Sequence, residues 1–399
     1  MKKITLINFL EYLLAFCIVI ECESMLTWSI EYGKFIKILI LSLLLFSVGF
    51  LTIINIRWIK VEKSKWELFL IFIMFSVIFV IINFNNVTKS VLFLLVLFIF
   101  GLYRTSIDSI NHNSLELMKK IINVVFVLAI ISIVFWILGS VLKVLETNVE
   151  IIVTRNKIIQ NIKGYYHLYY ESQMENTFGF NFYRNCGIFY EAPKYSLLLS
   201  IALMMEVFLV KRKVTFKAIM LIVTIISTFS LTGIVLVVFV VLSNFMISKS
   251  NLKIFSYIKW VSIFSLILIT LIIIGNLLNV KSTTNSYSDR LDDYIAGYKA
   301  WIVNPIFGNG YLNMDIIREN MSEFRARNIG FSNSIFRVLA QGGILLFSMY
   351  AFPVILWIKR AVYSKDFGRI FFAIGFILLF VTTSFPYNYL MLYLLTVFI

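Results

Sequence analysis

Long runs of apolar residues recur along this chain and are separated by short polar breaks. A run of about 20 apolar residues is long enough to cross the hydrocarbon core of a bilayer as a helix. Of the 399 residues, 60% are hydrophobic and only 14% are charged, which is too little polar surface for a soluble domain of this length. The sequence therefore predicts an integral membrane protein of the all-α class.

The apolar runs predict about twelve transmembrane helices and leave no soluble domain large enough to stand alone. The first run could imitate a signal peptide, but Glu11 interrupts it and no small-residue cleavage site follows, so we interpret it as an uncleaved span. The predicted spans are 4–22, 35–56, 67–84, 89–103, 119–142, 193–210, 214–230, 231–247, 254–278, 333–358, 369–384 and 386–399.

The chain carries a net charge of +15, which in a soluble protein would first suggest nucleic acid. In a membrane protein, basic residues are expected in the cytoplasmic breaks between spans. If the N-terminus is cytoplasmic, every second break is basic, provided that 214–247 contains two spans, and both ends of the chain are cytoplasmic. The basic residues of these breaks are Lys2, Lys3, Arg57, Lys60, Lys63, Lys65, Arg104, Lys119, Lys120, Lys211, Arg212, Lys213, Lys249, Lys253, Lys359, Arg360, Lys365 and Arg369.

Two long segments fall on the outer side in this topology and divide the chain into parts. Loops of this length in a compact protein are functional or disordered, and their composition favours order. The parts are five helices in 1–142, an outer segment 143–192, four helices in 193–278, a second outer segment 279–332 and three helices in 333–399.

The second outer segment contains a predicted amphipathic helix over 289–303. We expect Ser288 to be its N-cap and Pro305 to follow its end. Such a helix would lie on the membrane surface with its apolar stripe toward the lipid. The stripe consists of Leu291, Tyr294, Ile295, Tyr298, Trp301 and Ile302.

Charged residues gather at 184–195, where the first outer segment re-enters the membrane. Arg184 is suited to phosphate because the planar guanidinium donates paired hydrogen bonds. Glu191 and Lys194 add charge that the topology does not require. Interfacial anchoring, or an ion pair between Arg184 and Glu191, would explain the same residues. Pro193 fits the first turn of the following helix.

Five other places combine turn residues with polar groups. Arg290 lies near a helix start that can bind an anion, or it pairs with Asp292 or Asp293. Asn333 begins the next span as a cap or as a ligand. The remaining places are a tight turn at 304–310, a Gln-Gly-Gly sequence at 341–343, and a polar break at 227–233 that forms a hairpin turn or lines a groove.

Signatures of soluble enzymes are absent from the sequence, including phosphate-binding glycine loops, nucleophile elbows and HExxH. Cys17, Cys22, Cys186, His112 and His167 show no spacing typical of metal ligands. A redox or zinc-dependent function is therefore not expected.

Taken in order, these segments resemble the O-antigen polymerase and ligase superfamily of bacterial membrane proteins, and most closely the Wzy-type polysaccharide polymerases. The similarity covers roughly residues 165–350. This chain inserts Ala192 between the glutamate and proline of the first motif. Ser332 stands where many members, notably ligases, have histidine, which weakens a ligase interpretation. The matching motifs are Arg184-x-x-Gly187-Ile188-Phe189-x-Glu191-x-Pro193, Thr228-x-Ser230-x-Thr232-Gly233, Ser288-x-Arg290, Asn304-Pro305-x-Phe307-Gly308-x-Gly310, and Ser332-Asn333 followed by Gly342-Gly343.

The resemblance implies a GT-C-like glycosyltransferase of the bacterial cytoplasmic membrane that uses no metal and no cofactor. It would join polyprenyl-pyrophosphate-linked oligosaccharide units into an O-antigen or capsule polymer. Arg184 and Arg290 would stabilise the departing pyrophosphate, and Glu191 is the candidate base. The other candidate substrate-binding residues are Gly187, Lys194, Tyr195, Ser230, Ser332 and Asn333.

The partners implied are the lipid-linked donor and acceptor, membrane lipids, a chain-length regulator and a flippase, with no nucleic acid. An O-antigen ligase, a flippase or transporter of lipid-linked oligosaccharides, and a structural membrane partner are the alternative functions. The tyrosines at 165–170 either stack on sugar faces or anchor the chain at the membrane interface.

Overall fold

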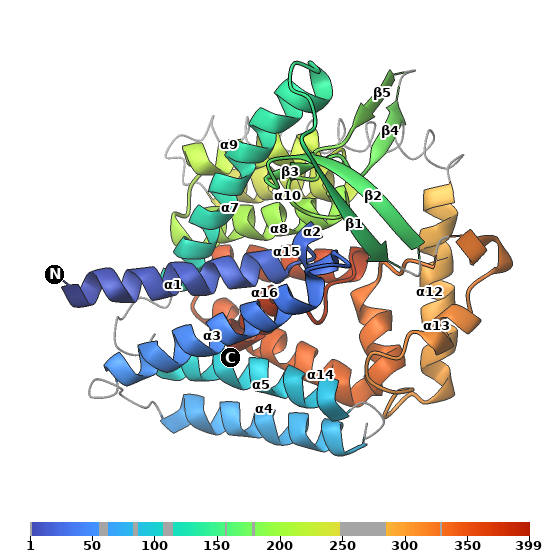
Figure 1. Ribbon diagram of the computed structural model, residues 1–399. Coiled ribbons are helices and arrows are strands. Elements are labelled where there is room, and N and C mark those ends of the chain that lie inside the picture. Colours follow the sequence, from blue (N-terminus) through green and yellow to red (C-terminus); the bar gives the residue numbers. More distant parts are fainter. Residues whose placement is uncertain are drawn as a thin grey trace, which may run out of the picture. The chain divides into compact units, whose positions relative to one another are not determined.

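The computed structural model describes residues 2–55, 63–82, 87–106, 115–155, 158–177, 180–247, 285–327 and 329–399 (Figure 1). Each predicted span coincides with a helix, except 254–278, which lies outside the described residues. The long helices are α1 (Lys2–Glu21), α3 (Gly33–Asn55), α4 (Lys63–Ile82), α5 (Val87–Ser106), α7 (Glu116–Phe135) with η3 (Trp136–Val141), α8 (Ala192–Met204) with η4 (Met205–Val210), α9 (Phe216–Ser227), α10 (Leu231–Ile247), α14 (Ser334–Tyr363), α15 (Phe367–Thr382) and α16 (Tyr389–Phe398). The helices outside the predicted spans are α2 (Met25–Trp28), α12 (Asn285–Val303), α13 (Asp315–Glu319) and η5 (Glu323–Arg327).

Apolar helices of membrane-spanning length are present, as expected for a membrane protein. By length and composition, four helices among the described residues can cross a bilayer. These helices cover Gly33–Ile54, Glu116–Val141, Ala192–Val210 and Ser334–Tyr363. The shorter apolar helices are Ile73–Ile82, Phe216–Ser227, Leu231–Ile247, Phe367–Thr382 and Tyr389–Phe398.

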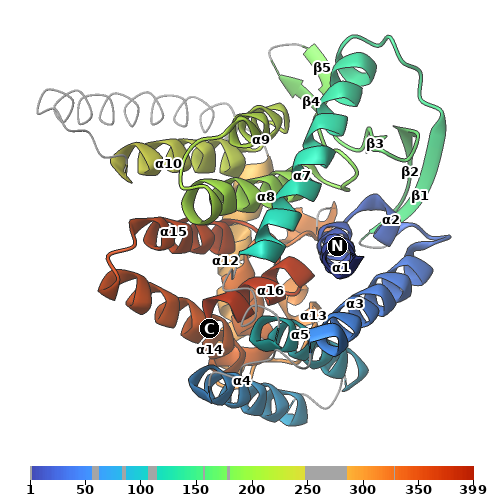
Figure 2. The same ribbon diagram turned by 90° about the vertical axis from the view of Figure 1, so that its left-hand side faces the viewer.

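The chain forms two compact units, each assembled from segments that are distant in sequence. In the first unit α1 lies beside α3 and α7, and α7 packs against α8 and α9 (Figures 1 and 2). In the second unit α14 packs against α4, α12 and α15. The first unit consists of Met1–Ile59, Ile110–Asn244 and Asn388–Leu390, and the second of Lys60–Ser109, Phe245–Tyr387 and Met391–Ile399.

The first outer segment is ordered, as predicted, but it folds into strands, so the chain is mostly helical rather than purely α. β1, β2 and β3 form an antiparallel sheet in that order, with Val149 opposite Gly164 and Gly164 opposite Tyr170. β4 and β5 form a separate antiparallel hairpin. The strands are β1 (Val149–Arg155), β2 (Ile158–Tyr165), β3 (Tyr169–Tyr170), β4 (Met174–Thr177) and β5 (Phe180–Tyr183).

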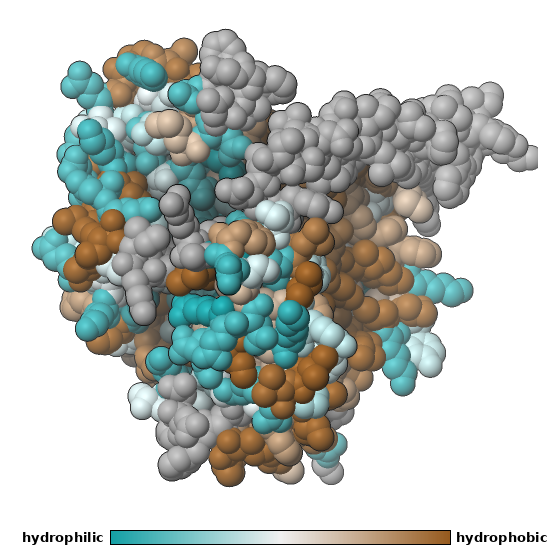
Figure 3. Space-filling model, turned by 90° about the vertical axis from the view of Figure 1, so that its right-hand side faces the viewer, coloured by the Kyte–Doolittle hydropathy of each residue, from teal (hydrophilic) through white to brown (hydrophobic). Residues whose placement is uncertain are grey.

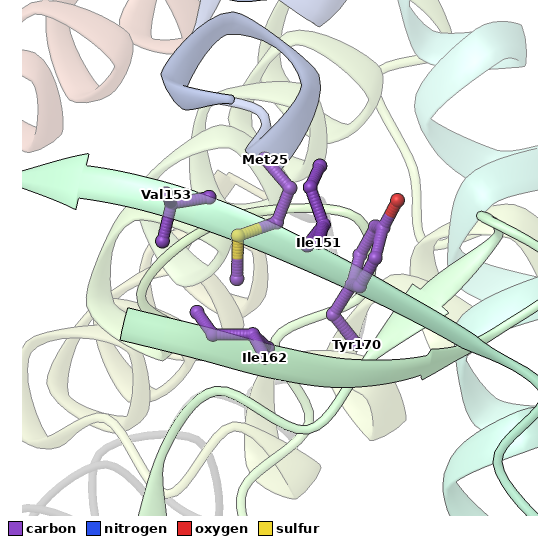
Figure 4. Packing of buried hydrophobic residues seen from close by; sticks show 5 residues of the cluster. All are labelled: Met25, Ile151, Val153, Ile162 and Tyr170. Atoms are coloured by element: carbon purple, nitrogen blue, oxygen red, sulfur yellow. The ribbon is translucent and has the colours of Figure 1, made fainter. Parts of the chain in front are cut away.

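A small apolar core joins this sheet to α2 (Figure 4). Side chains alternate along β1, so that Ile151 and Val153 are buried whereas Ile152 is 52% exposed. Met25 of α2 is fully buried against them, together with Ile162 of β2. Because Met25 comes from the break after α1, this core fixes the first outer segment to the N-terminal helices.

The amphipathic helix of the second outer segment is confirmed as α12, with a different first turn. It begins at Asn285, so Ser288 lies inside the helix and is not its N-cap, and it ends at Val303 as predicted. Its acidic residues Asp292 and Asp293 are buried, whereas most of the apolar stripe is exposed. On the side of the structure that carries α12, exposed hydrophobic residues adjoin hydrophilic ones (Figure 3).

We predict that Met25→Ala lowers the free energy of unfolding by about 2–5 kcal/mol, because the methionine leaves a cavity between α2 and the sheet. The measurement is thermal unfolding of the detergent-purified protein. Ile152→Ala removes an exposed side chain of the same strand and should change the midpoint little. Equal effects of the two substitutions would contradict this core.

Candidate functional site

Arg184 is held between the first outer segment and the break that follows α9. Its Nε donates to the carbonyl oxygen of Thr228 at 2.8 Å, and its Nη1 lies 3.4 Å from the carboxylate of Glu175. The side chain is 11% exposed, and within the described residues its Nη2 makes no hydrogen bond. The predicted alternative of an ion pair with Glu191 is therefore not the one formed, because Glu175 takes that place.

The residues after Arg184 are fixed by a buried amide. Asn185 Nδ2 donates to the hydroxyls of Ser132 at 3.3 Å and Ser227 at 2.9 Å, and Asn185 Oδ1 accepts from the amide of Gly187 at 3.1 Å. Gly187 has φ +55°, and a Cβ there would press on the ring of Tyr195. The motif thus joins α7, α8 and α9, which explains why it requires both a small residue and an amide side chain.

Tyr195 and Lys194 both make contacts within the protein. Tyr195 is fully buried, with its ring stacked on Phe189 at 5.1 Å and its hydroxyl 2.9 Å from Ser132 Oγ. Lys194 Nζ lies 2.6 Å from the carboxylate of Glu23. Both residues therefore support the loop around Arg184.

Glu191 and Ser230 lie at helix ends on either side of the segment. Glu191 directly precedes α8, with Pro193 in the first turn as predicted, but its carboxylate does not cap the helix. The predicted break is confirmed as a break between two apolar helices, because α9 ends at Ser227 and α10 begins at Leu231. In this break Ser230 Oγ lies 3.0 Å from Thr232 Oγ1.

Cysteine and tyrosine side chains near this segment are buried and protonated. Burial raises the pKa of the Cys186 thiol to about 11, so it is not a nucleophile at neutral pH. Tyr165, Tyr169 and Tyr170 are buried, and burial raises the pKa of each. Only Tyr166 of the four tyrosines is exposed and available to contact a sugar or the membrane interface.

The buried acidic face of α12 surrounds Arg325, a residue that the sequence analysis did not single out. Arg325 is 2% exposed and lies 2.9 Å from Asp293, 3.3 Å from Asp289 and 3.5 Å from Asp292. It also donates to the carbonyl oxygen of Gly330. Arg325 thus takes the two aspartates that were the predicted alternative partners of Arg290. The feature of the sequence that indicates such a partner is the group of aspartates at 289–293, because buried carboxylates need a cation.

Asp293 connects this cluster to the start of α14. It accepts hydrogen bonds from the amide of Ser332 at 2.8 Å and from its hydroxyl at 2.6 Å. Burial raises the pKa of Asp293, and the bonds from Ser332 and the charge of Arg325 oppose that rise. Ser332, which stands where many members of the resembled family have histidine, is therefore hydrogen-bonded to Asp293 of α12.

Asn333 is confirmed as the cap of α14, because its Oδ1 accepts from the amide of Phe336 at 3.0 Å. Tyr294 of α12 lies near it. Burial raises the pKa of the Tyr294 hydroxyl, whereas the charge of Arg290 and the side chain of Asn333 lower it.

The predicted tight turn at 304–310 enters a break in α14. Gly343 has φ +61°, which interrupts the helix. The amides of Ile344 and Leu345 would donate to Ala340 and Gln341 in a continuous helix. They donate here to the carbonyls of Pro305 at 2.9 Å and Ile306 at 3.1 Å.

The carbonyl groups of Ala340 and Gln341 lose their helical partners at the break and accept hydrogen bonds from amides of the turn at 304–310. Ala340 O accepts from Asn309 N at 2.9 Å, and Gln341 O accepts from Gly310 N at 3.1 Å. The exchange requires close backbone approach, since a Cβ on Gly308 would overlap the amide of Gly342. Two motifs noted separately in the sequence thus form one structure.

Comparison of the chain with models of known protein families gave no match, and no curated protein sequence matched it either. Within the described residues, no three or more His, Cys, Asp or Glu side chains are grouped so as to hold a metal ion. The candidate residues are therefore described separately in each unit: the Arg184 segment in the first, and the starts of α12 and α14 in the second.

Replacing Arg325 by methionine should lower the free energy of unfolding by about 3–5 kcal/mol, because three aspartates lose their buried partner. Arg318→Met is the matched control, since Arg318 pairs with the exposed Asp315 and should cost about 1 kcal/mol or less. Thermal unfolding in detergent measures both variants. A small effect at Arg325 would show that the cluster does not organise the second outer segment.

Gly308→Ala should destabilise the protein, because φ +74° is unfavourable for alanine and the added Cβ overlaps the backbone of α14. The control is Gly49→Ala in α3, where a Cβ meets nothing within 4 Å and alanine favours the helix. The unfolding midpoint should fall for the first variant and stay or rise for the second. The reverse order would argue against the insertion of the turn into α14.

Proposed function

We propose that this protein is a polysaccharide polymerase of the bacterial cytoplasmic membrane. In this proposal it crosses the membrane about twelve times, with both termini in the cytoplasm and the two long segments outside. It transfers a glycan from polyprenyl pyrophosphate to the terminal sugar of a second lipid-linked unit, building an O-antigen or capsule polymer.

The observation that carries the proposal is that motif residues distant in sequence contact one another within each unit. Arg184 hydrogen-bonds to Thr228 of the polar break in the first unit. In the second unit, the turn at 304–310 pairs with the break in α14, and Ser332 is bonded to α12 near Arg290. Motifs that merely set the topology would not need these mutual contacts.

Cations near the departing pyrophosphate would favour the proposed glycosyl transfer. The bond between the anomeric carbon and the pyrophosphate oxygen breaks, and the acceptor hydroxyl forms the new glycosidic bond while losing its proton. Negative charge grows on the departing pyrophosphate, so preorganised donors there lower the barrier. Arg184 suits this role because its guanidinium is held in place while Nη2 remains available among the described residues. Arg290 provides the second cation.

Glu191, which directly precedes α8, is our candidate for accepting the proton of the acceptor hydroxyl. Ser230, Ser332 and Asn333 would bind polar groups of the substrates, whereas Lys194 pairs with Glu23 and would support the loop around Arg184. Tyr195 and Gly187 are buried or packed, so we assign them to shaping the Arg184 loop rather than to substrate contact.

A ligase would use the same donor with a different acceptor, and Ser332 in place of histidine argues against it. A flippase or transporter usually has short outer loops. Here the described residues of the segment 143–192 form a sheet that shares an apolar core with α2, which favours an enzyme over a carrier.

We predict that Arg184→Ala and Arg290→Ala each reduce long-chain polymer by at least about 100-fold, as loss of a transition-state donor does. Surface glycans of cells carrying each variant, separated on a gel, measure the effect. Lys163→Ala, an exposed basic residue of the same outer segment as Arg184, is the control and should leave the polymer unchanged. Intact polymer in both arginine variants would support a structural membrane partner without catalysis.

Deletion of the gene separates the remaining alternatives. A polymerase predicts that long chains disappear while single repeat units persist. Complete loss of exported lipid-linked glycan would indicate a flippase. Long polymer that accumulates on the carrier lipid would indicate a ligase.

A further inference from the structure

Lys120, near the start of α7, makes only neutral contacts within the described residues. Its Nζ donates to Oδ1 of Asn8 at 2.8 Å and lies 4.8 Å from the centre of the Tyr12 ring. Both partners belong to α1. The Lys120 side chain is partly exposed and an ammonium group has three donors, so it can reach a further acceptor at the surface of the unit.

Lys217, in the first turn of α9, is held in the same way by α7. Its Nζ donates to Oδ1 of Asn123 and lies 5.7 Å from the centre of the Phe126 ring. Nδ2 of Asn123 donates in turn to the hydroxyl of Tyr12 at 2.8 Å, and the Tyr12 ring is the one that Lys120 contacts. One amide and one tyrosine therefore connect the two lysines across three helices.

No carboxylate forms an ion pair with Lys120 or Lys217 in the part of the chain that the structure describes. The acceptors of both lysines are amide oxygens. The neighbouring Lys119, in contrast, lies 2.5 Å from the carboxylate of Glu116. Two like charges in one network repel each other, so an anion that contacts both lysines would be attracted by two charges.

An exposed apolar row runs along α7 away from these lysines. Val127, Ile130 and Val134 are 53%, 37% and 46% exposed. Their spacing of three and four residues places them on the same face of the helix as Lys120 and Asn123. At 1.5 Å per residue, the helix rises about 21 Å from Lys120 to Val134, which is enough to cross one leaflet of the hydrocarbon core, about 15 Å thick.

In the first unit α7 lies between α1 and α9, so the lysines and the apolar row belong to one surface (Figure 2). That surface is cationic at one end and apolar along its length, which matches the chemistry of an anionic phospholipid. Basic sites between membrane helices bind the headgroups of such lipids. Basic residues at the start of a span are also expected from topology. Topology needs only their charge, however, and does not require lysines that are held by amides and rings of neighbouring helices.

We propose that Lys120 and Lys217 bind the phosphate of an anionic phospholipid whose acyl chain lies along Val127, Ile130 and Val134. The lipid bridges α1, α7 and α9 and stabilises their packing, because it binds the folded protein. In the topology proposed above, α7 and α9 begin on the cytoplasmic side, so this lipid belongs to the cytoplasmic leaflet and is not the glycan donor. The inference does not depend on the polymerase function.

The test is titration of phosphatidylglycerol into the full-length protein in detergent, with bound lipids counted by native mass spectrometry. Phosphatidylcholine with the same acyl chains, which has no net charge, is the comparison. We expect phosphatidylglycerol to bind more tightly and to raise the unfolding midpoint. Lys120→Gln and Lys217→Gln should each weaken phosphatidylglycerol binding about five-fold. The double variant should bind it no more tightly than phosphatidylcholine.

Lys163→Gln is the matched control, because it removes the same charge from an exposed lysine of β2 in the same unit, and it should bind phosphatidylglycerol as the wild type does. Ile130→Asn tests the apolar row and should weaken the binding of both lipids alike, since it acts on the acyl chain. Thermal unfolding without added lipid confirms that each variant is folded.

Two outcomes would overturn the inference: wild-type protein that binds the two lipids equally, or lysine variants that bind phosphatidylglycerol as the wild type does. Glycerol 3-phosphate, which carries a phosphate without acyl chains, tests the other source of the anion. If it binds through Lys120 and Lys217 as tightly as phosphatidylglycerol, the ligand is a soluble phosphate compound and the assignment to a lipid is wrong.

Discussion

The requirement that every backbone polar group be hydrogen-bonded away from water governs this structure. It explains why the apolar runs form helices, since a helix satisfies its backbone internally. It also explains the places where helices stop. At Gly343 the broken helix exchanges four hydrogen bonds with the turn at 304–310, and no backbone group of the exchange is lost. The break after α9 likewise offers the carbonyl of Thr228 to Arg184.

Charge imposes the second constraint, because ionised groups are costly to bury without partners. Arg325 allows the acidic face of α12 to turn inward, and the apolar stripe is therefore left exposed. An exposed apolar stripe is suited to the membrane surface, as the sequence pattern suggested. The cluster of Arg325 and its aspartates also holds Ser332, because Asp293 accepts a hydrogen bond from it. This contact positions the N-terminal end of α14, where Asn333 lies.

The sequence predicted the long helices well because a membrane span leaves a strong signal in composition. It also located the helix break before Leu231, the turn at 304–310 and the cap Asn333. It did not predict the strands of the first outer segment, since short strands with mixed side chains resemble ordered loops. The first turn of α12 was placed late, at Ser288, because polar residues there gave no helical periodicity. The role of Arg325 was not predicted because a basic residue shows no sign in the sequence of being buried.

The sequence by itself determined that the chain has apolar helices able to cross a membrane, where these helices lie and which short segments carry unusual residues. Those properties follow from local hydropathy and from backbone preferences at glycine and proline. Only the tertiary structure decided which charges are neutralised and by which partners. Partners such as Arg325 and Asp293, or Arg184 and Thr228, are tens of residues apart, and their pairing depends on packing that local sequence does not encode.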